Sequence, residues 1–325
     1  MSSLDDESTC EVCGGGEIPS NKKVSTSCAQ KVDHCKNDVG ASDKVLGNSS
    51  AGIDAVSDSF DRVDMSDDDN DDKLFADPPP KEDCQICFQP MPFAHAPRGG
   101  NTYGASPMYQ PCCGKVMCNG CMITSVNEMS EGNMKDLCLF CRVPMYRSGK
   151  EYIKRLENRT DLEDTEAFYH LGSKYWNGNL GLPKDMNIAI ELYNHAANLG
   201  SCAAHYKLAS AYYLGRGVKM DEEKAMYHFK LAAIGGHEEA RHFLGGMELD
   251  GNMDRSMKHF MIAARSGHDK SLKKVGDGYK AGYVTKDEYA STLRAYQVSF
   301  DEMKSEQRTT VEGILVKSRS RTISS

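Results

Sequence analysis

Eight cysteines are the residues of this sequence whose type and spacing predict chemistry. They form three Cys-x-x-Cys motifs and one adjacent pair: Cys84 and Cys87, Cys112 and Cys113, Cys118 and Cys121, and Cys138 and Cys141. A Cys-x-x-Cys turn presents two thiolates to one metal ion, and four thiolates in tetrahedral geometry are a usual ligand set for zinc. The eight thiols therefore predict two structural zinc ions and no catalytic metal position.

The composition around these cysteines favours metal over disulfide bonds. The chain has 13 Cys, an odd number, and it begins with neither the basic start nor the apolar run of a signal peptide. A segment this short buries little apolar surface, and coupled zinc binding supplies roughly 10–16 kcal/mol of folding free energy. We therefore expect a cytoplasmic or nuclear protein that contains a small α+β zinc module.

The order of the cysteine pairs resembles that of a RING finger. Three stretches carry the resemblance: Cys84-Gln85-Ile86-Cys87, Cys112-Cys113-Gly114-Lys115-Val116-Met117-Cys118-Asn119-Gly120-Cys121, and Cys138-Leu139-Phe140-Cys141-Arg142. The resemblance implies a cross-braced fold, in which the first and third pairs share one zinc and the second and fourth share the other. The chain is then an eight-cysteine variant of the family.

The second zinc site departs from the family's usual ligand pattern. Lys115 stands where a histidine ligand is usual, and a lysine ammonium has no lone pair to give to a metal. Cys112 is expected to replace the histidine as the fourth ligand. His95 is the alternative.

Most RING fingers are ubiquitin ligases, which position a ubiquitin-charged conjugating enzyme and do no covalent chemistry themselves. By resemblance, Ile86 matches the apolar residue that docks the conjugating enzyme, and Arg142 matches the arginine that contacts both enzyme and ubiquitin. Two further contact positions carry Ser125 and Leu139 in place of the usual apolar residue and proline.

The sequence after residue 150 consists of a repeat, which is expected to form the helices beside this module. The copies open with a small residue and an apolar one four positions later: Ala167 and Leu171, Ala204 and Leu208, Ala240 and Leu244, and Ser271 and Val275. A glycine eleven positions after each opening residue is expected to end the first helix of the copy: Gly178, Gly215, Gly251 and Gly282. Asp185 and Asp221 are expected to cap the second helix. Ala-Ala-x-x-Gly motifs then end at Gly200, Gly236 and Gly267.

This pattern resembles the Sel-one-like repeat, a relative of the tetratricopeptide repeat, over residues 163–308. The residues that carry the resemblance include Gly181-Leu182-Pro183-Lys184-Asp185 and Ala196-Ala197-Asn198-Leu199-Gly200. The resemblance implies an all-α superhelix of helix pairs that scaffolds protein complexes, without catalysis.

Three segments are expected to lie outside these two domains. Residues 1–83 carry a net charge of −12, which leaves +4 for the remaining residues because the whole chain carries −8. We expect residues 1–81 to be a disordered acidic tail, 149–162 a linker, and 309–325 a basic disordered tail. The zinc module occupies 82–148 between them. Cys10, Cys13, Cys28 and Cys35 lie in the acidic tail, where free thiols are the favoured interpretation.

The multidomain organisation supports two functions. In the first, the protein is a ubiquitin ligase whose partners are a ubiquitin-conjugating enzyme and a protein substrate held by the repeats. In the second, it is a non-catalytic adaptor that uses both modules for protein binding. Neither a nucleic acid, a membrane nor a small-molecule substrate is expected, because the chain lacks a basic stripe, an apolar span and a phosphate-binding loop.

Overall fold

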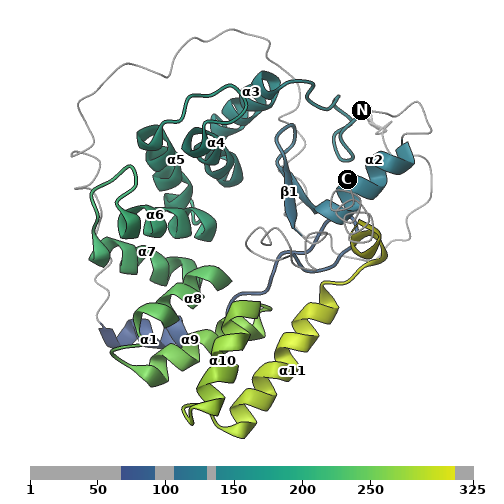
Figure 1. Cartoon of the computed structure of the whole chain (residues 1–325). Coiled ribbons are helices and arrows are strands. Elements are labelled where there is room, and N and C mark those ends of the chain that lie inside the picture. Colours follow the sequence, from purple (N-terminus) through teal and green to yellow (C-terminus); the bar gives the residue numbers. More distant parts are fainter. Residues whose placement is uncertain (1–66, 92–105, 130–136, 312–325) are drawn as a thin grey trace, which may run out of the picture. The chain divides into compact units, whose positions relative to one another are not determined.

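The computed structural model describes residues 67–91, 106–129 and 137–311. These residues form a small module of two strands and one helix, followed by a run of helices (Figure 1). Within the described ranges, no helix is both long and apolar enough to cross a membrane. The predicted combination of an α+β module and an all-α repeat region is confirmed at this level.

The cysteine-rich module is built on a two-stranded antiparallel hairpin. Strands β1 (Pro107–Gln110) and β2 (Lys115–Cys118) pair with Tyr109 opposite Val116. Gly114 turns the chain between the strands at a φ of +71°, a conformation that side chains other than glycine's rarely adopt. Helix α2 (Asn119–Met129) starts directly after β2. This arrangement places the end of β2 and the first turn of α2 beside each other.

The repeat region consists of consecutive helices, each packed on the next. Their bounds are α4 (Thr165–Asn177), α5 (Met186–Asn198), α6 (Cys202–Leu214), α7 (Glu222–Ile234), α8 (Glu238–Met247), α9 (Met253–Arg265), α10 (Asp269–Lys280) and α11 (Lys286–Glu302). The small and apolar residues of the repeat are buried as predicted, and Ala167, Ala204, Leu208, Ala240 and Leu244 are fully buried. The alanines allow neighbouring helices to approach closely.

The predicted helix ends are confirmed in the first two copies and differ in the third. Gly178 and Gly215 end α4 and α6 in the left-handed conformation, and Asp185 and Asp221 cap α5 and α7. The prediction that Gly251 ends a helix is wrong, because α8 already stops at Met247. In the third copy the first helix, α8, has 10 residues, whereas α4 and α6 each have 13.

The prediction of a linker at residues 149–162 is wrong. This segment contains helix α3 (Gly149–Thr160), which Ser148 caps by accepting a hydrogen bond from the backbone of Glu151. Tyr152, Ile153 and Leu156 form its buried face and join the apolar core of the first repeat. The polar composition of the segment concealed this narrow apolar stripe, which covers the open end of the repeat stack.

The prediction of disorder is wrong for part of the two tails. Helix α1 (Asp67–Phe75) lies within the segment 1–81, and Leu74 is fully buried against the repeats. At the other end, residues 306–311 are helical and Val311 is buried. The tertiary contacts of a few apolar side chains order these stretches, although their local composition is polar. Residues 1–66 and 312–325 lie outside the described ranges.

Candidate metal centre

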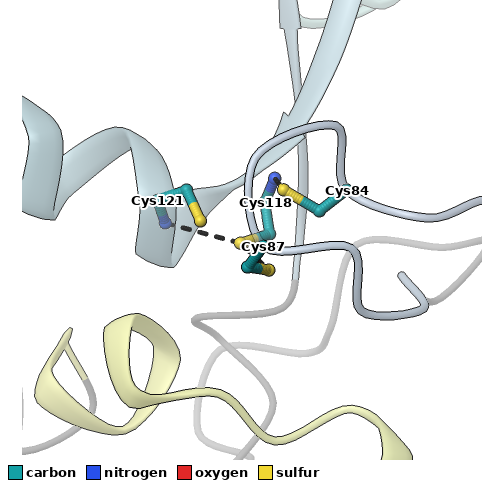
Figure 2. Close-up of side chains that lie close together, drawn as sticks. All are labelled: Cys84, Cys87, Cys118 and Cys121. Carbon is teal, nitrogen blue, oxygen red and sulfur yellow. Dashed lines mark hydrogen bonds between the residues drawn. The ribbon is translucent and has the colours of Figure 1, made fainter.

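The first group of thiols combines a loop, a strand end and a helix start. Cys84 and Cys87 lie in the loop before β1, Cys118 ends β2, and Cys121 lies in the first turn of α2. Figure 2 shows their four side chains pointing toward one another. Their Sγ atoms all lie within 4.8 Å of one another. Residues separated by about 30 positions therefore meet at one point.

The second group has the same composition and comes from the remaining pairs. Cys112 and Cys113 lie in the hairpin turn between β1 and β2, and Cys138 and Cys141 lie in the loop before α3. These four Sγ atoms also lie within 4.8 Å of one another. The pairs therefore alternate between the two groups along the chain, in the cross-braced order that the RING resemblance implied.

The two Cys-x-x-Cys loops have the same backbone geometry. Phe88 and Arg142 directly follow the second cysteine of each loop, with φ values of 54° and 61°. Their amides donate hydrogen bonds to the carbonyls of Cys84 and Cys138, at 2.8 and 3.0 Å. Each loop is closed by an isolated β-bridge, Asp83 with Pro90 and Leu137 with Pro144. The matching geometry makes each loop a rigid holder for two thiols.

The donor geometry fits a tetrahedral metal ion. A tetrahedron with Zn–S distances of about 2.3 Å separates its sulfurs by about 3.8 Å. The Sγ atoms of Cys87 and Cys118 are 3.9 Å apart, and those of Cys113 and Cys138 are 3.8 Å apart. All eight cysteines are free thiols. The spacing is therefore that of ligands around an ion and is too long for disulfide bonds.

Hydrogen bonds from backbone amides and neighbouring thiols favour the thiolate form of one cysteine in each group. The amide of Cys118 donates to Cys84 Sγ at 3.2 Å, and the amide of Cys121 donates to Cys118 Sγ at 3.4 Å (Figure 2). The hydrogen bond with the Cys118 thiol is the leading cause that lowers the pKa of Cys84 to about 4, and the hydrogen bond with the Cys112 thiol is the leading cause that lowers the pKa of Cys113 to about 5. The same hydrogen bonds raise the pKa of the partner thiols, Cys118 and Cys112. In each group the hydrogen bonds thus favour the thiolate form of one cysteine, and the thiolate is the form that binds a metal ion.

The structure includes Cys112 in the second group, as expected from the loss of the usual histidine. Lys115 is exposed on β2 and supplies no ligand. The alternative ligand His95 lies outside the described residues, as do Cys10, Cys13, Cys28 and Cys35. Two groups of four cysteines are therefore available to hold metal ions. That the ions are zinc stays a prediction.

The two predicted partner-binding residues lie on the surface of the thiol loops. Ile86 is 37% exposed in the first loop, and Arg142 is exposed after the second. Phe88, at 74%, is more exposed than Ile86 and was not singled out in the sequence. Val143 is also exposed, directly after Arg142. Each loop therefore presents an apolar side chain to solvent.

Sequence reasoning missed Arg308, which contacts the first thiol loop from the C-terminal end of the repeats. Its guanidinium donates hydrogen bonds to the carbonyls of Gln89 and Pro90 at 2.9 and 2.8 Å, and the residue is 2% exposed. A Cβ atom on Gly120 would lie 2.8 Å from the Cα of Arg308, so this contact requires glycine within Cys118-Asn-Gly-Cys121. Arg308 lies at the boundary between a helical and a polar segment, where no sequence pattern marked it.

A second contact between the module and the repeats was also missed. The hydroxyl of Tyr109 donates to Asp164 Oδ2 at 2.9 Å, and the same oxygen accepts from Arg159 Nε at 2.8 Å. Asp164 also caps α4 through its other oxygen, Oδ1. The Tyr109 ring stacks on His170 with centroids 5.0 Å apart. One carboxylate therefore connects strand β1, helix α3 and the first repeat.

Parts of this chain are similar to known proteins. A fission yeast protein, chitin synthase regulatory factor 3 of Schizosaccharomyces pombe, is 33% identical over 95 residues, which are 28% of this chain and 10% of the relative. This chain therefore spans about a tenth of the length of that curated relative.

Two solved structures are similar in part. The protective antigen c5321 of uropathogenic Escherichia coli, described as displaying an SLR fold, is 30% identical with a TM-score of 0.41 over 46% of this chain and 33% of the antigen. A Sel1 repeat protein from Oxalobacter formigenes is 20% identical with a TM-score of 0.43 over 54% of this chain and 81% of that protein. The model of the Sel1 repeat matches residues 165–201 and 202–237. These two segments, which are the helix pairs α4–α5 and α6–α7, are therefore Sel1 repeats.

Proposed function

We propose that this protein is a zinc-dependent RING-type ubiquitin ligase, in which the cysteine module positions a ubiquitin-charged conjugating enzyme and the Sel1 repeats hold a protein substrate. The observation that carries the proposal is the alternation of the four cysteine pairs between two groups of four thiols. This order is the defining feature of the cross-braced fold. Sel1 repeats mediate protein–protein interactions, which suits the recruitment of a substrate.

Zinc has a structural role in this proposal. Each ion would be held by four cysteines, so no coordination position is left for a substrate or a water molecule. Its contribution is to fix the two loops that carry Ile86 and Arg142. The loops then act by holding the charged enzyme in a reactive geometry, because the attacking lysine and the thioester belong to the partners.

Metal content is the first test. Native mass spectrometry of the purified full chain is expected to show two zinc ions per chain. Cys112→Ser is expected to lose one of them, because it removes one of four ligands from the second group. The matched control is Cys202→Ser, which changes a thiol that belongs to neither group. One ion or none in the unmodified protein contradicts the two-zinc site.

Thioester discharge is the second test. The full chain is expected to accelerate the loss of ubiquitin from at least one conjugating enzyme of a panel, in the presence of free lysine. Arg142→Ala is expected to slow discharge about tenfold or more without loss of zinc, because it removes the guanidinium that would donate hydrogen bonds to the enzyme and to ubiquitin in the reactive complex. Arg142→Lys keeps the charge and loses the planar pair of hydrogen-bond donors, so its rate of discharge is expected to stay close to that of Arg142→Ala. Ile86→Ala should instead weaken binding of the conjugating enzyme.

An adaptor without ligase activity is the second candidate. Ser125 is the observation that favours it, because a polar hydroxyl occupies a helix α2 position that is usually apolar in ligases of this family. Under this alternative the module binds two zinc ions and accelerates discharge from no conjugating enzyme. Equal discharge by the unmodified protein and Arg142→Ala would likewise count against the ligase.

A further inference from the structure

The acidic helix α1 packs against helices α6, α7, α8 and α9, and the surface that it covers on them is called the groove below. It contacts α7 and α9 (Figure 1). Its sequence, DDDNDDKLF, carries five aspartates and one lysine and ends in its only two apolar residues, Leu74 and Phe75. The groove recognises this helix through three kinds of contact.

The first contact is an apolar socket for Leu74. This side chain is fully buried in a cluster with residues of α6, α7 and α8, namely Ala209, Ala225, Phe229, Ala232, Ala233, Ala240 and Leu244. Five of these seven residues are alanines, and their small side chains leave room for one large side chain between the helices. The small residues of the repeat motif thus create the space that Leu74 fills.

The second contact is a buried cation at the C-terminal end of α1. Arg241 on α8 is 2% exposed, and its guanidinium donates one hydrogen bond to the carbonyl of Leu74 and another to the carbonyl of Ala233, the latter at 2.8 Å. The last carbonyls of a helix have no partner within the helix, and the negative end of its dipole attracts a cation. Arg241 therefore recognises the end of a docked helix, whatever its side chains.

The third contact reads an aromatic residue and an acidic residue. The guanidinium of Arg255 on α9 lies 4.9 Å from the centre of the Phe75 ring, and the same arginine pairs with Asp71. The Nζ atom of Lys258 lies 5.7 Å from the centre of the same ring. The ion pair with Arg255, helped by the charge of Lys230, lowers the pKa of Asp71. Two cations, Arg255 and Lys258, thus flank Phe75, and Arg255 is shared between Asp71 and Glu248 of the groove.

Residues 67–75 have the properties of a ligand that folds on docking. A helix of nine residues is too short to be stable by itself in water, and this one is dominated by like charges. Pro78-Pro79-Pro80 follows it and cannot continue a helix. Its order therefore comes from the groove, and among the side chains of α1 that the structure describes, the contacts are made by Asp71, Leu74 and Phe75, together with the carbonyl of Leu74.

We propose that this groove on α6, α7, α8 and α9 is a binding site for acidic helical segments of partner proteins with the pattern Asp/Glu-x-x-Leu-Phe, and that α1 is the chain's own competing copy. A tethered segment of this kind reaches an effective concentration on the order of millimolar, so a partner must displace it. This site is separate from the cysteine module and does not depend on ligase activity.

The test measures binding of a synthetic peptide, residues 64–78 of this chain with an N-terminal fluorescein, to the full chain by fluorescence anisotropy. Leu74→Ser combined with Phe75→Ser in the protein removes both anchors of α1 and opens the groove. This variant is expected to bind the peptide about tenfold or more tighter than the unmodified protein does. A peptide that carries the same two serines is expected not to bind.

Charge reversal in the groove locates the binding. In the opened protein, Arg255→Glu is expected to weaken peptide binding about tenfold or more, because it repels Asp71 and removes the contact with Phe75. Arg265→Glu is the matched control, since it makes the same charge change on an exposed residue of the same helix, and it is expected to leave binding within about twofold.

Asp71→Arg is the second way to open the groove, because it replaces attraction to Arg255 by repulsion and leaves Leu74 in place. The peptide is measured on Asp71→Arg in place of the double serine variant if circular dichroism shows that the double serine variant has lost helix content. The proposal is overturned if neither opened protein binds the peptide more tightly than the unmodified chain, or if Arg255→Glu and Arg265→Glu weaken binding equally.

Discussion

At the scale of single residues, three side chains begin helices by the same hydrogen bond but respond differently to pH. Ser201, His237 and His268 precede α6, α8 and α10, and each side chain accepts a backbone N–H from three residues later, at 3.2 Å. The histidines accept through Nδ1, which is available only while the imidazole is neutral at that nitrogen. The two later caps therefore depend on deprotonated histidine.

His237 is expected to make the repeats lose stability as the pH falls. Burial, and then the charges of Lys207 and His268, lowers its pKa from 6.5 to about 3. The unfolded chain takes up a proton below pH 6.5 and the folded chain does not until about pH 3. Full stability is therefore present above pH 6.5 and is lost progressively toward pH 3, with a slope of at most about 1.4 kcal/mol per pH unit for this one group.

His237→Ser removes the titrating imidazole and gives α8 a serine cap like that of Ser201 on α6. Urea unfolding of the full chain between pH 7 and 4 is expected to show a shallower loss of stability for this variant. The loss of the ring that stacks on Tyr206, with centroids 4.3 Å apart, lowers stability equally at every pH. A slope identical to that of the unmodified protein would show that the cap histidine is not the group that titrates.

At the scale of helices and loops, stability comes from small residues that bring helices together and large ones that fill the remaining space. Leu208 on α6 is fully buried in the core of the first two repeats. α6 and α7 pack extensively on each other, as do α4 and α5. A cavity at this position cannot close easily, because its neighbours belong to different helices.

Leu208→Ala is expected to cost about 2–5 kcal/mol of unfolding free energy. Leu214→Ala provides the control on the same helix, because Leu214 is 52% exposed at its C-terminal end. Its cost is expected to stay below about 0.5 kcal/mol. Chemical denaturation followed by circular dichroism measures both variants, and similar costs for the two would contradict the assigned core.

At the scale of the whole molecule, two polar contacts join the cysteine module to the repeats. Arg308 connects the end of the repeats with the carbonyls of the first thiol loop, and Asp164 connects the first repeat with Tyr109 on β1. Both contacts use a charged group that is largely shielded from water. Metal binding in the module should therefore affect the two ends of the repeat region.

Removal of metal with a chelator is expected to release the module and the C-terminal helical turn together. Hydrogen exchange should increase across residues 84–91, 106–125 and 306–311, because Arg308 loses its two acceptors when the first loop unfolds. The interior helices α5 to α8 should keep their protection, since their apolar clusters contain no cysteine ligand. Unchanged exchange at 306–311 would separate Arg308 from the metal-dependent loop.

The sequence by itself determined the features that follow a local period. The Ala-x3-Leu repeat predicted the helices and their buried faces, and the paired cysteines predicted two groups of four thiols, because both patterns express a fixed geometry over a few residues. The caps at Asp185 and Asp221 followed for the same reason. Only the tertiary structure decided the order of α1 and α3 and the roles of Arg241 and Arg308. Their surroundings are polar or acidic in sequence. These helices and side chains are ordered by contacts with a few apolar side chains and backbone carbonyls. The partners belong to elements more than a hundred residues away or to a neighbouring repeat, so no local sequence pattern contains them.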